Sequence, residues 1–409
     1  MKVKYLLLIL ICLLSLTMLT GCYNISGIEN KAYAIALGID KSDTQQLKLS
    51  IQFAVLSGSS SSGSSSGDEE SDSGEDKTST ILTVDSATLD SGIELINSYI
   101  SKQVNLSHCK AIIISEEYAS EGVANILYTL MNNIELRPDC SIIISKCNAD
   151  DFLKNSNPVF ESNPAQYFKL NFNSSEYTGF LNNLYMSDFY YNTLSTSSDP
   201  CAILGAINSE ESRTHSALDD NYIAGQTPLI SKNKVESMGT AVFRGDKFVG
   251  ELNNLETLCH LIIKNKFKTG IINIENPYDS NTIVSFYTAL NRKTKINVKY
   301  EDKIPKIECE IWLSSNIPTI YNTLDLSDQS CVEKLNSVFS KHVETKVLDY
   351  LNKTKDYGAD IVGFGERLLP NYQTWQDWLD AEWLENYKNA TFKVTVHSEI
   401  QGGYLYNSI

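Results

Sequence analysis

The chain has 409 residues, of which 42% are apolar and 21% charged, and its formal net charge is −16. This length exceeds one ordinary core, so two or three domains are expected. Nucleic acid is excluded as a partner class, because its binding requires clustered Lys and Arg rather than an acidic surface. The same charge disfavours electrostatic adhesion to anionic lipid, so membrane attachment would need a different anchor.

The first feature along the chain is an apolar run at residues 5–19, preceded by two lysines. Spanning a bilayer takes roughly 20 apolar residues, so the run is short for a span and predicts a signal peptide over residues 1–21. The stretch LTGC at 19–22 has the form of a bacterial lipobox. Cys22 is therefore predicted to carry the lipid, as S-diacylglycerol or N-palmitoyl cysteine. The alternative is an uncleaved anchor, which leaves the rest of the chain on the same side of the membrane.

Two strands and an insertion follow. Residues 27–40 predict one strand, and alternating apolar residues at 47–55 predict a second that forms a hairpin with it. Residues 57–80 contain Ser, Gly, Thr, Lys and acids but no apolar side chain, so this segment is predicted to be a disordered insertion. Its GSSSG at 63–67 lacks the flanking strand and helix that a hydrolase nucleophile requires.

Order is expected to resume at Thr83. Helical spacing at 89–100 and 126–130 alternates with apolar strands at 111–115 and 141–145, which is typical of a mixed α/β domain. Residues 156–235 are rich in Asn, Ser, Tyr and Pro. They predict a long irregular connection with one helix near 180–185.

The second half begins with two short strands that flank a turn at Arg244-Gly245-Asp246, followed by a helix from about Leu255. The RGD triplet is interpreted as a structural turn rather than an adhesion motif. A single apolar stripe predicts a long helix over 332–351. A Trp-rich helical stretch follows it, and TFKVTVHSEI predicts a closing strand at 391–400. Three further strands are predicted before the long helix, at 281–290, 295–301 and 307–313.

These elements predict an α+β (mixed α/β) protein with three small domains, each a mixed sheet with packed helices, after a cleaved signal peptide. The expected segments are the signal peptide 1–21, an N-terminal domain 22–195, a middle domain 196–275 and a C-terminal domain 276–409.

The Cys, His and Trp residues form no catalytic or metal-binding pattern in the sequence. Of the nine cysteines, Cys12 lies in the signal and Cys22 would carry lipid; the other seven show no CxxC pair, although a Cys140–Cys147 bridge remains possible. The five histidines stand alone, GFGE at 363–366 lacks a dinucleotide fingerprint, and Trp375, Trp378 and Trp383 are interpreted as packing residues. The sequence therefore predicts no catalytic residue, metal or cofactor.

Four stretches together resemble the Ger(x)C family, the lipoprotein C subunits of spore germinant receptors. These are the lipobox with CYNISGIENKAYAIALGID, the insertion with HCKAIIIS to ELRPDCSIIIS, the hairpin GTAVFRGDKFVGELNNLET, and GADIVGFGE with the closing strand. The positions that match the family pattern are Gly38, Asp40, Gly250, Asp360, Gly363, Gly365 and Trp383. The sequence departs from that pattern at Tyr23-Asn24 and at EIQGG near the C-terminus.

The resemblance implies a noncatalytic lipoprotein on the outer face of the spore inner membrane. It further implies two integral membrane partners, the A- and B-type subunits, with the bilayer held through acylated Cys22. Nutrients such as amino acids, sugars or nucleosides would trigger the assembly. The runner-up is a solute-binding lipoprotein of a transporter, which requires two similar doubly wound lobes. A cell-envelope hydrolase ranks third, because it would require a nucleophile and a base.

Overall fold

The computed structural model describes residues 3–7, 9–10, 27–55, 79–158, 160–161, 164–208, 221–318 and 324–401. Its strands are β1 (Lys31–Asp40), β2 (Leu47–Ala54), β3 (Ser79–Ser86), β4 (Gln103–Asn105), β5 (Ala111–Ser115), β6 (Ser141–Ser145), β7 (Cys201–Ile207), β8 (Val235–Arg244), β9 (Lys247–Leu252), β10 (Thr269–Asn276), β11 (Asp279–Glu301), β12 (Ile304–Asn316) and β13 (Thr391–Ile400). Its helices are α2 (Leu89–Tyr99), α3 (Glu116–Glu121), α4 (Ala124–Asn132), α5 (Ala149–Lys154), α6 (Pro164–Asn173), α7 (Ser175–Thr178), α8 (Met186–Thr193), α9 (Asn254–Ile263), α10 (Gln329–Tyr357), α11 (Phe364–Leu368), α12 (Trp375–Asp380) and α13 (Trp383–Asn386). Short 3-10 helices are η1 (Ile28–Asn30), η3 (Leu369–Asn371) and η4 (Tyr387–Asn389).

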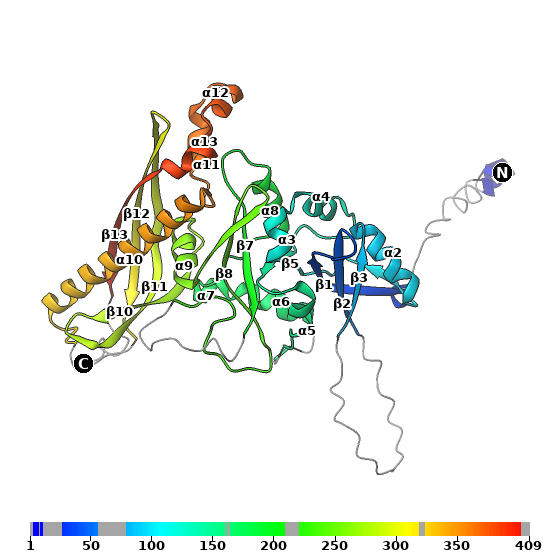
Figure 1. The fold of residues 1–409 in the computed structure, drawn as a ribbon, viewed down its shortest axis with the longest axis horizontal. Helices are drawn as coiled ribbons and strands as arrows, with labels where there is room; N and C mark the ends of the chain where they lie inside the picture. The colour runs from blue at the N-terminus through cyan, green and yellow to red at the C-terminus, as the bar shows by residue number, and fades with distance from the viewer. Residues whose placement is uncertain are drawn as a thin grey trace, which may run out of the picture.

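The larger sheet has nine strands in the order β3-β2-β1-β5-β6-β7-β8-β9, with β4 beside β1 (Figure 1). Its centre is parallel, from β1 through β5 and β6 to β7, and both edges are antiparallel hairpins. The central strand β5 is buried along its whole length. Ile112 and Ile114 pack on one face of the sheet and Ile113 on the other, as a doubly covered strand requires.

Helices cover both faces of this sheet. Side chains of α2, α4 and α8 share one apolar core with the strands, and side chains of α5 and α6 share the core on the opposite face. The spacing of Leu89 and Ile96 on α2, and of Ile126 and Leu130 on α4, places these residues on single helix faces that point to the sheet.

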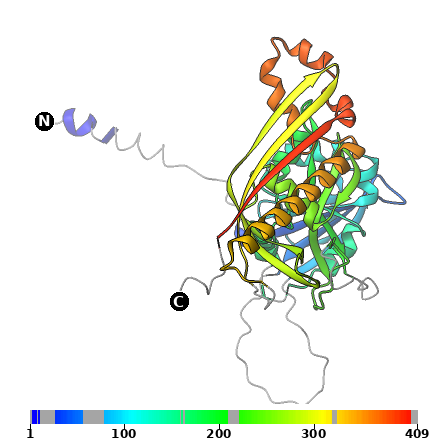
Figure 2. The ribbon, with the colours of Figure 1, turned by 90° about the vertical axis from the view of Figure 1, so that its left-hand side faces the viewer.

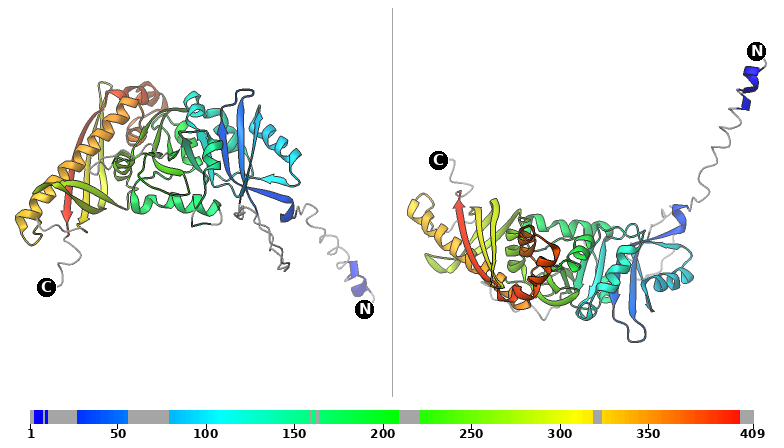
Figure 3. Two further views of the ribbon diagram at one scale, coloured as in Figure 1. Left: turned by 60° about the horizontal axis from the view of Figure 1, so that its bottom comes forward. Right: turned by 90° about the horizontal axis from the view of Figure 1, so that it is seen from above.

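The smaller sheet has the order β10-β11-β12-β13 and carries the long helix α10 along one face (Figure 2). The last strand, β13, pairs parallel to β12, while the other two pairings are antiparallel. Phe339, Val343 and Val347 of α10 are buried in one core with Phe286 of β11 and Ile311 of β12. The two sheets lie toward opposite ends of an elongated molecule (Figure 3).

The expected mixed α+β fold is confirmed, as are several of its elements. The β1–β2 hairpin, helix α2, the strands β5 and β6, the β8–β9 hairpin, helix α10 and strand β13 all form where their patterns predict them. The turn of the β8–β9 hairpin falls at Gly245, which has a φ of 60°. The RGD triplet is therefore a structural turn.

The prediction of an irregular connection over 156–235 was wrong. This segment contains α6, α7, α8 and strand β7, and the helix predicted near 180–185 begins at Met186 instead. Leu181 and Tyr185 form isolated bridges to Gly239 and Ser141, so contacts distant in sequence hold these residues extended. Because most of the segment is polar, the short apolar stretch CAILGAI, which forms β7, was not predicted as a strand.

The separate strands predicted at 281–290 and 295–301 were also wrong, because both belong to β11. The polar residues Asn291–Thr294 suggest a turn between two strands. In the structure they lie within β11, where the pairing with β12 shifts register between Leu290 and Lys295. Such bulges bend a strand without ending it. Strand β10, which precedes β11, was missed.

The predicted boundary at residue 195 falls between β6 and β7, two strands that pair within one sheet. The division into domains at 22–195, 196–275 and 276–409 stays a prediction. Of the predicted insertion 57–80, only Ser79 and Thr80 are described, at the start of β3. Cys22 and most of the signal peptide 1–21 lie outside the described residues.

Candidate functional site

Four of the residues singled out by sequence meet at one buried loop. Asp360 follows α10 and is fully buried. Its carboxylate accepts hydrogen bonds from the backbone N–H of Gly363 at 2.8 Å and of Gly365 at 3.0 Å, and from the indole Nε1–H of Trp383 at 2.9 Å. The N–H of Phe364 donates a fourth bond at 3.1 Å. One carboxylate thereby holds the start of α11 and the start of α13.

The two glycines of this loop are needed for different reasons. Gly363 has a φ of 78°, in the left-handed region that L side chains rarely adopt. Gly365 has no room for a side chain, because a Cβ there would lie 2.5 Å from both the carbonyl oxygen of Ser197 and Nε1 of Trp383. The sequence GFG therefore reflects close approach of the loop to the segment before β7.

A second buried carboxylate, Asp199, was missed by sequence reasoning. It accepts hydrogen bonds from the N–H of Gly245 at 2.8 Å and of Asp360 at 2.9 Å. The backbone N–H of Asp199 in turn donates to the carbonyl oxygen of Asp360 at 2.9 Å. We call Asp199 and Asp360 the carboxylate junction, because they tie β7 and the β8–β9 turn to the end of α10.

Burial raises the pKa of both carboxyls at the junction. The pKa of Asp199 is raised to about 6, against the opposing effect of the N–H donors of Gly245 and Asp360. The pKa of Asp360 is raised by burial and lowered in part by its own N–H donors. Backbone and indole donors surround these oxygens, so the geometry supports an architectural role rather than proton transfer.

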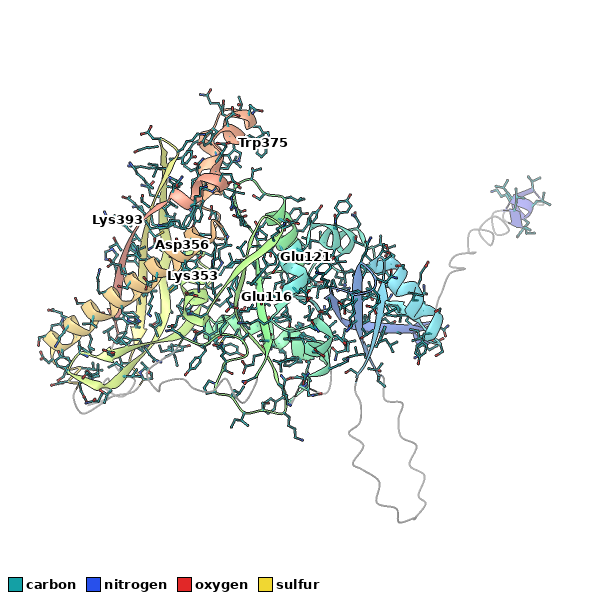
Figure 4. All side chains as sticks on the ribbon, viewed as in Figure 1. Glu116, Glu121, Lys353, Asp356, Trp375 and Lys393 are labelled. Carbon is teal, nitrogen blue, oxygen red and sulfur yellow. The ribbon has the colours of Figure 1, made fainter. Side chains whose placement is uncertain are left out.

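Gly250 lies at a second contact between the two halves. A Cβ at this position of β9 would collide with the ring of Tyr357, whose hydroxyl donates to the carbonyl oxygen of Glu251 at 3.3 Å. Nearby, Lys353 lies on α10, where Figure 4 labels it. Its Nζ lies 2.8 Å from Oε2 of Glu256 and ties α10 to α9. Gly250 thus permits the close packing of β9 against the last turn of α10.

Gly38 and Asp40 belong to a separate contact at the end of β1. The carboxylate of Asp40 accepts hydrogen bonds from the N–H groups of Ala149 at 2.6 Å and Asp150 at 3.0 Å, at the N-terminus of α5. These bonds satisfy donors that an α-helix leaves free at its start. Gly38 lies beneath the same helix, where a Cβ would be 3.0 Å from Leu153.

Cys140, Cys147 and His260 occupy structural positions in the described part of the chain. Cys140 and Cys147 are free thiols. They flank strand β6, whose five residues span about 16 Å, so the bridge left open by sequence does not form. Nδ1 of His260 lies 2.7 Å from the hydroxyl oxygen of Tyr350, and burial lowers the pKa of this imidazole well below its usual range.

The described residues show neither a metal-binding cluster nor a membrane-spanning helix. No cluster of His, Cys, Asp and Glu in the described ranges is arranged to hold a metal ion. Over the same part of the chain, no helix is long and apolar enough to cross a membrane. The fold and the junction define a two-sheet α+β protein in which the residues singled out by sequence build its architecture.

Family models match most of the chain. The model of the spore germination protein N-terminal domain matches residues 25–207, and the "Spore germination B3/ GerAC like, C-terminal" model matches residues 238–403. The chain belongs to the Ger(x)C (GerAC-like) family of germinant receptor C subunits, as the sequence resemblance indicates.

Curated relatives and one crystal structure agree with this family. The chain is 24% identical to the putative spore germination protein YfkR of Bacillus subtilis (strain 168), over 99% of this chain and 98% of the relative. It is 22% identical to spore germination protein GerQC of Bacillus cereus, over 73% and 76% of the two chains. The crystal structure of the GerBC protein matches with a TM-score of 0.52 at 17% identity, over 89% of this chain and 96% of that one, and so shares the fold.

Proposed function

We propose that the chain is the noncatalytic, lipid-anchored C-type subunit of a spore germinant receptor, required for nutrient-triggered spore germination. The observation that carries this proposal is the match of two family models, over residues 25–207 and 238–403. The buried carboxylates support a noncatalytic role, because backbone and indole donors occupy their oxygens.

The proposed location follows from the N-terminal sequence. After removal of residues 1–21, Cys22 would carry an S-diacylglycerol or N-palmitoyl group and hold the protein on the outer face of the spore inner membrane. Acyl chains on one cysteine supply the paired hydrophobic signals that stable anchoring needs. The proposed partners are the two integral membrane subunits of the receptor, of A and B type.

The proposal is tested in spores that lack this chain. Such spores should lose the fall in optical density that a nutrient mixture causes in wild-type spores, and the wild-type chain should restore it. Spores that lack the chain and still respond normally to every nutrient sensed by the wild type would contradict the proposal.

The alternative is a solute-binding lipoprotein of a transporter. That class predicts two similar doubly wound lobes, whereas the described residues form a nine-stranded mixed sheet and a dissimilar four-stranded sheet. Calorimetric titration of the purified chain with amino acids, sugars and nucleosides separates the two functions. Tight binding in the absence of membrane partners would favour the alternative.

A further inference from the structure

Two buried cysteines meet where the central strands β5 and β6 begin. Cys109 lies two residues before β5, and Cys140 lies directly before β6. Both side chains are fully buried in the core that α4 and α8 share with the larger sheet. The thiol of Cys140 donates a hydrogen bond to the carbonyl oxygen of Cys109 at 3.0 Å. We call these two residues the thiol pair, and the structure describes the pair in its reduced form.

The strand register sets the distance between the two cysteines. Ala111 of β5 pairs with Ser141 of β6. Cys140 therefore lies beside Lys110, one position off register from Cys109. Neighbouring strands about 4.8 Å apart, with a rise of about 3.3 Å per residue, give a Cα separation of about 6 Å for this arrangement. Disulfides span Cα separations of about 4.4–6.8 Å, so rotation of the side chains is enough to join the two sulfur atoms.

The two thiols also contact each other. Hydrogen bonding to Cys140 is the largest cause that raises the pKa of the Cys109 thiol well above its usual range, and burial raises this pKa further. Thiol–disulfide exchange requires a thiolate, so the pair reacts slowly once the chain has folded. The oxidation state of the thiol pair is therefore set during folding, before the core closes over β5 and β6.

We propose that Cys109 and Cys140 are joined by a disulfide in the mature protein. The inference goes beyond the receptor function and rests only on the export proposed above, because disulfides persist outside the cytoplasm and are rare within it. The oxidant is a low-molecular-weight or enzyme-bound disulfide that meets the chain as it folds.

The bridge forms in two exchange steps. One cysteine of the thiol pair loses its proton, and its thiolate attacks one sulfur of the oxidant and releases the other sulfur as a thiolate. The second cysteine then loses its proton and attacks the sulfur of the first. The bond between Cys109 and Cys140 forms, and the second oxidant thiolate leaves. The chain is oxidised by two electrons, the oxidant is reduced by the same two, and the two protons end on the released thiols.

A bridge at this position closes the connection between two central strands. The segment between Cys109 and Cys140 contains β5, α3 and α4. Closing it limits the conformations of the unfolded chain, whereas the folded chain loses little freedom because both side chains are already buried. The oxidised wild type should therefore unfold about 5 °C above the reduced wild type.

The test uses the full-length, affinity-tagged chain purified from spores. N-ethylmaleimide is present from lysis onward, and the chain is then denatured in it and digested without a reductant. Mass spectrometry should find the peptides of Cys109 and Cys140 cross-linked, and lighter by two hydrogen atoms than the two thiol peptides together. Maleimide on both residues in most of the chain overturns the proposal. A bridge from either residue to a different cysteine overturns it as well.

Cys147→Ser is the matched control, because Cys147 is a half-buried free thiol that follows the opposite end of β6. This variant should keep the cross-link and the difference in unfolding midpoint between oxidised and reduced chain, whereas Cys109→Ser should lose both. A midpoint difference that persists in Cys109→Ser overturns the proposal. The cross-link is measured on the isolated chain, so normal germination of spores that lack the chain would contradict the proposed function and not the bridge.

Discussion

At the scale of single residues, Asp360 is predicted to contribute strongly to stability. Replacing it with Ala removes the carboxylate acceptor of three backbone donors and one indole donor, of which only the N–H of Gly363 keeps another acceptor, the carbonyl oxygen of residue 360 at 3.3 Å. Each such donor costs about 1–3 kcal/mol, and relaxation of the loop recovers part of this, so Asp360→Ala should lower the free energy of unfolding by about 3–5 kcal/mol. Urea denaturation followed by tryptophan fluorescence measures this value.

The matched control for that measurement is Asp380→Ala, on the exposed surface of α12. It should change the free energy of unfolding by no more than about 0.5 kcal/mol. An Asp360→Ala variant as stable as this control would show that the loop does not depend on its carboxylate.

The raised pKa of Asp199 predicts a pH dependence. The folded state holds this proton to a pKa of about 6, above the ordinary value of 3.8, so it binds more protons than the unfolded state between these values. The resulting stabilisation is present at low pH and is lost as pH rises through 6. Between pH 7.5 and pH 5 the wild type should gain about 1.4 kcal/mol relative to Asp199→Asn.

The comparison with Asp199→Asn is required because His260 acts in the opposite direction. Burial lowers the pKa of this imidazole well below 6.5, so the unfolded state binds its proton first and stability falls as pH drops. This contribution is common to both chains and cancels in the difference. Parallel pH profiles of the wild type and Asp199→Asn would contradict the raised pKa.

Single residues differ in how far the sequence predicts them. Gly363, Gly365, Asp360 and Trp383 follow from the family resemblance, and their contacts explain why these residue types are required. Asp199 follows from no local pattern, because its donors lie 46 and 161 residues away in sequence. In the sequence, a carboxylate with such distant partners cannot be told apart from any other polar loop residue.

At the scale of elements, helix α10 is the clearest case of a structure predicted from its sequence. Phe339 is fully buried on its apolar stripe, with its ring 4.4 Å from that of Phe286 on β11. Phe339→Ala should lower the free energy of unfolding by about 3–5 kcal/mol, because it removes this stacked contact and leaves a cavity. Chemical denaturation compares Phe339→Ala with Lys341→Ala, which changes an exposed position on the same helix. Equal losses of unfolding free energy in the two variants would show that the apolar stripe is not the buried face of α10.

The contact between β9 and α10 gives a second prediction at this scale. A side chain at Gly250 would collide with Tyr357, so Gly250→Ala should destabilise the chain by about 1–3 kcal/mol. Tyr357→Ala removes the obstructing ring. In a double-mutant cycle the two losses should therefore be less than additive, and strict additivity would exclude the collision.

The elements that the sequence did not predict depend on pairing between distant segments. The stripe of α10 recurs every three to four residues, so it is visible locally. The continuity of β11 depends on its pairing with β12 through two register shifts. The helix predicted near residues 180–185 fails because bridges to Ser141 and Gly239 hold that segment extended.

At the scale of the whole molecule, the two sheets are joined by shared core packing and by the carboxylate junction. Val242 and Leu252 of the larger sheet pack in the same core as Phe339 of α10. The mixed α+β class could be predicted from alternating helix and strand patterns. The arrangement of the two sheets could not, because it depends on contacts between residues in different halves of the chain.

The proposed function requires that lipid on Cys22 holds the chain at the membrane during germination. The most direct measurement compares spores that carry the wild-type chain with spores that carry Cys22→Ala, in membrane fractionation and in nutrient-triggered germination. Cys22→Ala should fold with an unchanged unfolding midpoint, leave the membrane fraction, and abolish most of the nutrient response. Normal germination of spores in which the variant is present but unlipidated would contradict the claim.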